Sequence, residues 1–211
     1  MTKDKIPKIS EKLSTSVFNS IVHSLFRDGT LTLADFEDEE KFKKKLLSIN
    51  AKADYKIIID HSESLISTAR QFNKTGKIEN AKLFYATYFE HELNGIILEL
   101  CQKKSIDKKT INDIIKSVNL IGKLTWLPLV LGIPQVSVAH KNTILKLADD
   151  RNAYIHYKHN PQPDEYDANE EQKEQEEIKK IERTITYFKK YVSRILYNKQ
   201  KTHLDKKLKR R

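Results

Sequence analysis

The sequence predicts an all-α protein, a helical bundle with a long charged C-terminal helix, and three observations lead to this prediction. The 211 residues include five glycines and five prolines, too few for the many tight turns of a β-sandwich or barrel. Apolar residues recur at intervals of three and four along most of the chain, which is helical spacing. Hydrophobic residues make up 38% of the chain and are clustered, which distinguishes it from disordered proteins.

Composition limits the class of protein further. The single cysteine, Cys101, excludes an intramolecular disulfide and a cysteine-based zinc site. The longest mainly apolar stretch, Trp126–Ile133, is far shorter than the ~20 residues of a membrane span, and the first residues contain no apolar signal segment. We therefore expect a cytoplasmic protein. Lysine and arginine number 39 against 29 acidic residues, an excess that favours polyanionic partners, either nucleic acid or an anionic membrane face.

Residues 1–50 are expected to form an N-terminal helical region. Apolar residues four apart from Leu13 to Leu25 predict a first helix, which ends near Gly29. Thr32 and Asp35 resemble a capping box, and the acids and then lysines that follow suit the dipole of a solvated helix. This region is either a separate helical pair or part of the main core.

The next predicted helices supply the centre of the bundle. Apolar spacing predicts helices over Tyr55–Phe72 and over Ile78–Lys103. The second has apolar residues around much of its circumference, so it should be central and largely buried. Glu92 lies within it and needs either a partner or a cleft. Asp107 is placed to cap a further helix over Lys108–Leu124.

A late helix completes the predicted core, which spans 51–163. The segment Trp126–Pro134 is expected to be an apolar loop that lines the core or an interface. Apolar spacing predicts a helix from Ser137 through Ile155, which Pro161 and Pro163 must terminate.

Residues 164–211 differ in composition from the core. Six apolar residues from Ile178 to Ile195 recur at alternating spacings of three and four, which predicts a helix packed on the bundle or on a second copy of the chain. The basic tail Lys206–Arg211 is expected to be disordered and to contact phosphates. In total, the pattern predicts six or seven helices.

Common catalytic motifs are missing from the sequence. It has no glycine-rich phosphate loop, no His-Glu-x-x-His and no Gly-x-Ser-x-Gly. His156 and His159 have a chelating spacing, but no cysteine is nearby and Pro161 follows. We expect surface histidines here and predict no metal and no cofactor.

One segment near the end of the late helix gathers chemically useful side chains. Arg151, Asn152, Tyr154, His156 and Tyr157 fall within seven residues. Asn152 and His156 are four apart and share a helix face, whereas Arg151 and His156 are five apart, about 140° around a straight helix. Arg151 and His156 would share a cleft if the helix end is distorted or if two chains form the cleft.

A structural interpretation of the same segment remains open. In it, Arg151 pairs with Asp149, Asp150 or Glu92, and the tyrosines cover the edge of the core.

The segment resembles the motif of the HEPN family (higher eukaryotes and prokaryotes nucleotide-binding domains). That motif is an arginine, four to six residues, then a histidine, often with a polar residue after the arginine, and Arg151-Asn152-Ala153-Tyr154-Ile155-His156 fits its four-residue form. The family also carries an acidic residue in an earlier core helix, for which Glu92 is the first match and Glu90 the second. The resemblance covers roughly residues 78–160.

The resemblance implies a homodimer in which the arginines and histidines of both chains meet in one cleft. Many members are metal-independent endoribonucleases that act as toxins, with an antitoxin or inhibitor protein as partner, or as antiphage effectors; others are catalytically silent. In one subgroup a nucleotidyltransferase modifies a tyrosine two residues after the histidine. Here Lys158 occupies that position and Tyr157 lies one residue early, which argues against this form of control.

The residue types suit RNA cleavage. The reaction uses the 2′-OH of the substrate, a proton carrier active near neutral pH and a fixed cation at the phosphate. We therefore assign His156 as general acid and base and Arg151 as phosphate clamp. Asn152 would hold the phosphate or orient His156. Tyr154 and Tyr157 are candidates for stacking on RNA bases. For Tyr154, a structural role as an aromatic residue at the edge of the core is an equal alternative.

Two other classes of function compete with the nuclease. One is a catalytically inactive helical module that binds nucleic acid or a protein partner. The other is a structural protein that reaches a membrane surface through its basic tail.

Overall fold

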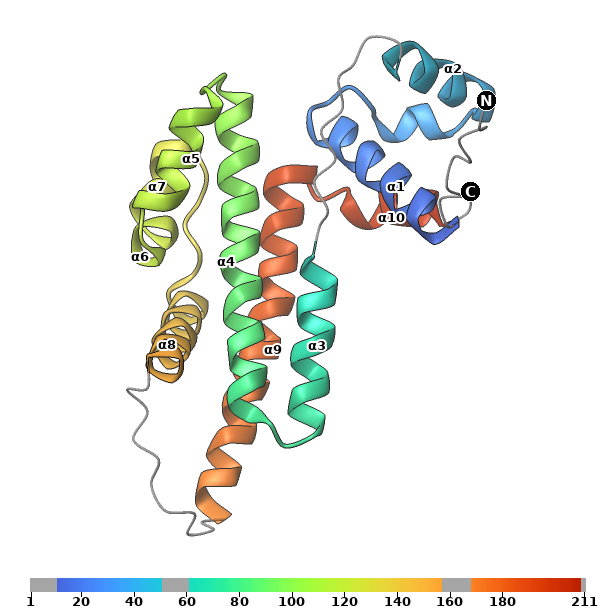
Figure 1. Ribbon diagram of the computed structural model, residues 1–211. Coiled ribbons are helices and arrows are strands. Elements are labelled where there is room, and N and C mark those ends of the chain that lie inside the picture. The colour runs from blue at the N-terminus through green and yellow to red at the C-terminus, as the bar shows by residue number, and fades with distance from the viewer. Residues whose placement is uncertain (1–10, 51–60, 157–167, 210–211) are drawn as a thin grey trace, which may run out of the picture. The chain divides into compact units, whose positions relative to one another are not determined.

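The computed structural model describes residues 11–50, 61–156 and 168–209 of the chain. Within these ranges it contains ten α-helices, one short 3₁₀ helix and no strand, which confirms the predicted all-α class (Figure 1). The ten helices exceed the six or seven expected for three reasons: one predicted helix is divided into α5 and α6, an expected loop contains α7, and the C-terminal segment forms α10. No helix in these ranges is long and apolar enough to cross a membrane.

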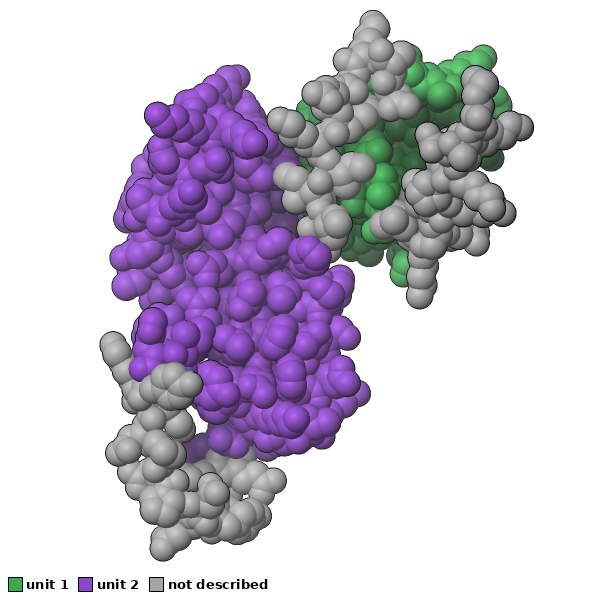
Figure 2. All heavy atoms as spheres, in the orientation of Figure 1, with its two compact units in different colours: residues 1–60, 200–211 green, residues 61–199 purple. Residues whose placement is uncertain are grey.

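The chain forms two compact units (Figure 2). One comprises residues 1–60 and 200–211, and the other residues 61–199. These limits differ from the expected boundaries after residues 50 and 163. The difference arises because the long C-terminal helix belongs to the bundle, whereas the short helix after it belongs to the N-terminal unit.

The second unit is a bundle arranged around one central helix, α4. It packs against α3, α5, α7, α8 and α9, as the centre of Figure 1 shows. The bounds are α3 Ser62–Lys74, α4 Ile78–Lys103, α5 Lys108–Ser117, α6 Leu120–Leu124, α7 Trp126–Leu131, α8 Val138–Ile155 and α9 Ala168–Tyr197. Tyr85, Tyr88 and Phe89 of α4 are fully buried. The prediction of a central, largely buried helix is confirmed.

The region after α5 differs from the prediction in two places. A single helix was expected over Lys108–Leu124, but Val118 is extended and Asn119 begins α6 by accepting a hydrogen bond from the Gly122 amide at 2.9 Å. A loop was expected over Trp126–Pro134, but its first part is α7. Pro128 is compatible with α7 because it lies in the first turn, where backbone N–H groups have no helical partner.

Helix α9 packs on the bundle through its predicted apolar stripe. The stripe residues Ile178, Ile181, Ile185, Phe188 and Val192 are buried, and Ile195 is partly buried. The ring of Phe188 meets that of Phe89 from α4 edge to face, with 5.6 Å between the centroids. Of the two alternatives left open by the sequence, the structure of the single chain shows α9 packed on its own bundle.

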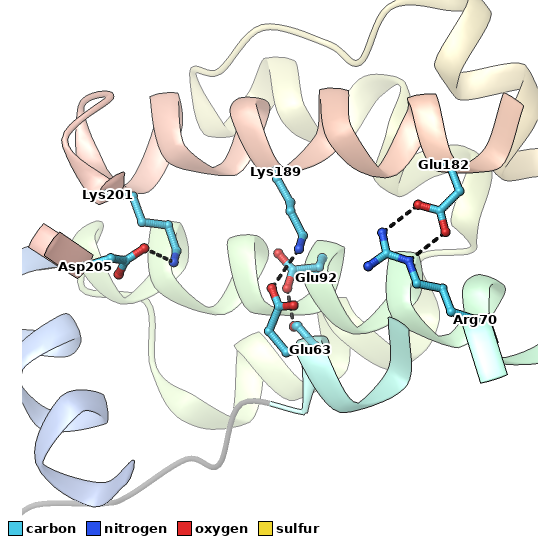
Figure 3. A network of polar contacts seen from close by, with 8 residues as sticks. Glu63, Arg70, Glu92, Glu182, Lys189, Lys201 and Asp205 are labelled. Carbon is cyan, nitrogen blue, oxygen red and sulfur yellow. Dashed lines mark hydrogen bonds and ion pairs between the residues drawn. The ribbon is translucent and has the colours of Figure 1, made fainter. Parts of the chain in front are cut away.

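A polar network also holds α9 to α3 and α4 (Figure 3). The guanidinium of Arg70 donates two hydrogen bonds to the Glu182 carboxylate, at 2.9 and 2.7 Å. The hydroxyl of the buried Tyr85 donates to the same carboxylate at 2.7 Å. The Arg70 hydrogen bond, together with that of Tyr85, lowers the pKa of Glu182 although burial opposes this shift.

This network predicts an acid-sensitive contribution to stability. The pKa of Glu182 is lower in the folded chain than the ~4.3 of an unfolded one. The contribution of the Glu182 carboxylate to the free energy of unfolding is therefore complete above pH ~4.3 and is lost as pH falls through the folded pKa. Glu182→Gln should reduce the free energy of unfolding at pH 7 by about 1–2 kcal/mol, and the difference from wild type should shrink toward pH 3. Urea unfolding at several pH values measures this. Glu174→Gln on the same helix is the control, and a pH-independent difference for Glu182→Gln would contradict the assignment.

The N-terminal unit is built from three helices and the 3₁₀ helix η1. Their bounds are α1 Glu11–Arg27, η1 Leu33–Phe36, α2 Glu39–Asn50 and α10 Lys201–Leu208. The expected capping box is confirmed, since the Thr32 amide donates to the Asp35 carboxylate at 2.7 Å, but it begins η1 rather than the charged helix.

Helix α10 closes this unit. Leu204 is fully buried, and Asp205 pairs with His23 of α1 at 3.2 Å. The tail from Lys206 was expected to be disordered, but α10 includes Lys206 and Lys207 because this buried leucine anchors the helix; residues 210–211 lie outside the described ranges.

Candidate functional site

Arg151 lies in the last turns of α8 and is held by two partners. Its Nη1 donates to Glu90 Oε2 of α4 at 2.6 Å. Its Nε and Nη2 donate to Oδ1 of the adjacent Asn152, at 3.4 and 3.2 Å. The side chain is 22% exposed, so the guanidinium lies at the surface while α4 holds it from one side. The alternative pairings of Arg151 with Asp149, Asp150 or Glu92 are not found.

The hydrogen bonds of Arg151 leave part of its guanidinium available. An arginine has five N–H donors, and these bonds to the described residues use three of them. No described residue accepts from the other two N–H groups, which can therefore bind a ligand such as a phosphate oxygen. A guanidinium already fixed by Glu90 loses less conformational freedom on binding than a mobile one.

Glu90, and not Glu92, is the acidic residue that contacts the arginine. The two are separated by about 200° around α4, so their side chains leave opposite sides of the helix. Glu92 instead accepts a hydrogen bond from Ser62 of α3. Figure 3 shows Glu92 on the side of α4 where Lys189 and Glu63 form an ion pair. The first match to the acidic residue of the HEPN motif is thus not at the site, and the second match is.

His156 follows the last residue of α8 and presents its side chain to solvent. Its backbone N–H donates to the Asn152 carbonyl at 3.1 Å, which closes the last helical turn. The side chains of Asn152 and His156 are both exposed. Among the described residues of one chain, no contact joins the imidazole to Arg151.

The remaining predicted residues fall at or beyond the edge of the site. Tyr154 is 41% exposed, and its hydroxyl donates to Asn80 Oδ1 of α4 at 3.2 Å. This contact fixes its ring at the rim of the bundle. Tyr157 and Lys158 lie outside the described residues.

Two further residues of the site were not predicted. Lys123 of α6 is 4% exposed, and its Nζ donates to Asn94 Oδ1 at 2.8 Å. Asn94 lies one turn after Glu90 on α4. Burial lowers the pKa of Lys123, and the charge of Glu90 opposes this shift. The sequence signal was a lysine inside the apolar run Leu120-Ile121-Gly122-Lys123-Leu124.

A separate charged cluster joins α4, α8 and α9. The nearly buried Lys82 pairs with Glu79 at 3.1 Å and with Glu177 at 3.0 Å, and Lys146 also bonds Glu177. Burial raises the pKa of Asp150 beside this cluster. Oppositely charged partners satisfy the cluster internally, so it serves to anchor α9. No group of three or more histidine, cysteine or acidic side chains in the described ranges could hold a metal ion.

The site therefore presents an oriented guanidinium, an adjacent amide and an exposed imidazole within six residues at the C-terminal end of α8. Comparison with family models, with curated proteins and with solved structures gave no significant match.

Proposed function

We propose that this chain is a HEPN-type, metal-independent endoribonuclease that acts as a toxin or as an antiphage defence effector. The observation that carries the proposal is the set of contacts and neighbours of Arg151. It is fixed to Glu90, has two N–H donors that no described residue uses, and lies within five residues of an exposed histidine. The basic balance of the chain agrees with a polyanionic substrate. The resemblance of the Arg151–His156 segment to the HEPN motif supplies the reaction class.

The proposed reaction needs only proton transfer and charge stabilisation. The 2′-oxygen attacks the adjacent phosphorus as a base removes its proton, and a new O–P bond forms. The bond from phosphorus to the 5′-oxygen breaks, and an acid donates a proton to that oxygen. The products are a 2′,3′-cyclic phosphate and a 5′-hydroxyl. Arg151 stabilises the charge on the phosphoryl oxygens, and His156 carries the protons.

The geometry favours a site made by two chains. One imidazole cannot accept one proton and donate another in the same step, and a two-fold dimer brings two copies of every site residue together. The separation of Arg151 from His156 within one chain agrees with such an arrangement, because each then works with the other chain's partner. The same proposal makes an inhibitor protein the expected partner of the toxin in the cell.

Expression of the Arg151→Ala variant tests this function. Wild-type protein should reduce colony formation and degrade cellular RNA, whereas Arg151→Ala should do neither, because the phosphate loses its cation. Counting colonies after induction, with a gel of total RNA, measures both effects. Purified wild type should cleave RNA equally well with and without a metal chelator.

Arg183→Ala is the matched control because it removes an exposed arginine of the same bundle from α9. It should behave like wild type. Equal RNA degradation by wild type and Arg151→Ala would contradict the assignment, provided that both are expressed at the same level.

A second candidate is a catalytically inactive module that binds nucleic acid. It accounts for the lack of contact between Arg151 and His156 in the described residues of one chain without a second chain. Such a module would bind RNA through Arg151 without changing RNA integrity, so the same gel separates the two functions.

A further inference from the structure

Lys123 is a buried cation with one neutral hydrogen-bond acceptor among the described residues. Its Nζ donates to Asn94 Oδ1, and apolar side chains that include Leu93, Leu127 and Pro128 surround the same small cavity. Removing an ammonium from water costs free energy that a neutral amide acceptor does not recover. A leucine or methionine would fill this position at lower cost. The presence of a lysine therefore needs another explanation.

Its neighbours suggest an electrostatic explanation. Glu90 lies one turn before Asn94, the partner of Lys123, on the same helix, and its charge raises the pKa of Lys123 against the effect of burial. Glu90 also bonds Arg151 at 2.6 Å. Arg151, Glu90 and Lys123 thus follow one another with alternating charge, and Lys123 is the buried member of the three.

This order matters for any anion that Arg151 binds. Arg151 and Glu90 alone form a neutral pair, and the carboxylate cancels much of the attraction that the guanidinium exerts on a phosphate. A positive charge behind Glu90 restores a net charge of +1. Because Lys123 is buried, solvent and salt screen its field less than that of a surface lysine.

We infer that Lys123 is a positioning residue of the phosphate site, which offsets the charge of Glu90 so that Glu90 can hold Arg151 without weakening its attraction for RNA phosphates. This inference rests on the proposed function for the identity of the ligand as RNA. Lys123 itself does not touch the substrate, since only 4% of the residue is exposed.

A charge-compensation cycle tests the inference by binding alone. The probe is a fluorescent single-stranded oligonucleotide with 2′-O-methyl groups, which cannot be cleaved by 2′-OH attack, and fluorescence anisotropy gives its Kd. Lys123→Met should weaken binding by roughly five- to thirtyfold at low salt. Glu90→Gln, which keeps an acceptor for Arg151, should tighten it. The double variant Lys123→Met/Glu90→Gln restores the net charge and should return the Kd to within about twofold of wild type.

The controls separate charge from structure. Lys116→Met removes an exposed lysine from α5 and should change the Kd much less than Lys123→Met does. Lys123→Gln is a second neutral variant that can still donate to Asn94, so the cycle can be completed if Lys123→Met does not fold. Circular dichroism and urea unfolding of each variant establish that it is folded.

Different experimental results would contradict the inference about Lys123 and the proposed nuclease function. If Lys123 only stabilises the fold, the double variant will bind no better than Lys123→Met, which overturns the inference. Failure of the wild type to bind the oligonucleotide also overturns it. A complete cycle in a protein that leaves unmodified RNA intact supports the inference and refutes only the nuclease.

Discussion

His156→Ala is expected to reduce RNA cleavage by about 10²–10⁴-fold while leaving the protein folded. Histidine is the side-chain type suited to proton transfer near neutral pH, and His156 is the histidine among the described residues of the site. The side chain is exposed, and its backbone hydrogen bond to Asn152 does not depend on the imidazole, so alanine should preserve the end of α8. The rate of cleavage of a labelled RNA, measured at equal protein concentration, gives the loss.

The control for this variant is His203→Ala, which removes an exposed histidine from α10. It should retain the wild-type rate, and the circular dichroism spectra of all three proteins should agree. Unchanged cleavage by His156→Ala would remove the general acid and base from the proposed mechanism. Loss of cleavage together with loss of helicity would instead identify His156 as a structural residue.

Phe89→Ala is expected to have the largest effect on stability, a loss of about 3–5 kcal/mol in the free energy of unfolding of the bundle. Phe89 is completely buried on α4, and its ring packs at 90° against the buried ring of Phe188 on α9. Truncation removes apolar area and leaves a cavity at the junction of the two longest helices. Thermal unfolding should show a decrease in Tm on the order of 10 °C.

Val130→Ala provides the matched control because Val130 is 68% exposed on α7. Its free energy of unfolding should stay within ~0.5 kcal/mol of wild type. A loss below about 1 kcal/mol for Phe89→Ala would mean that the contact between α4 and α9 is not part of a close-packed core.

Periodicity was sufficient to predict the long elements of the fold. Helix α4 has apolar residues on nearly every side and is central, and the stripe of α9 from Ile178 is buried as its spacing implies. Both patterns extend over several turns, so local exceptions do not obscure them. The divisions at Asn119 and within Trp126–Pro134 were missed because two short helices depend on caps and on contacts with α4 and α8 rather than on a repeating pattern.

The site was predictable only where its parts are adjacent in the sequence. Arg151, Asn152 and His156 lie in one segment, and their exposure follows from the end of one helix. The choice between Glu90 and Glu92 was not open to sequence reasoning, because it depends on which side of α4 faces α8.

Lys123 illustrates the same limit for a contact between separate helices. Its hydrogen bond to Asn94 joins residues 29 positions apart, on helices whose crossing no local pattern specifies. A charged residue within an apolar run was the available signal, and it did not identify the partner.

The division of the chain has a consequence for its order of synthesis. The N-terminal unit needs α10, which buries Leu204 and pairs with His23 of α1, yet the whole bundle is translated between these two segments. During translation, the core around α1 and α2 therefore stays incomplete while residues 61–199 are synthesised and can fold. A nascent chain acquires its bundle, with Arg151 and Glu90 in place, before the unit that contains α1 and α2 is complete. Premature termination after Lys199 would accordingly leave the unit of α1 and α2 without its last helix, whereas the bundle would keep all of its helices.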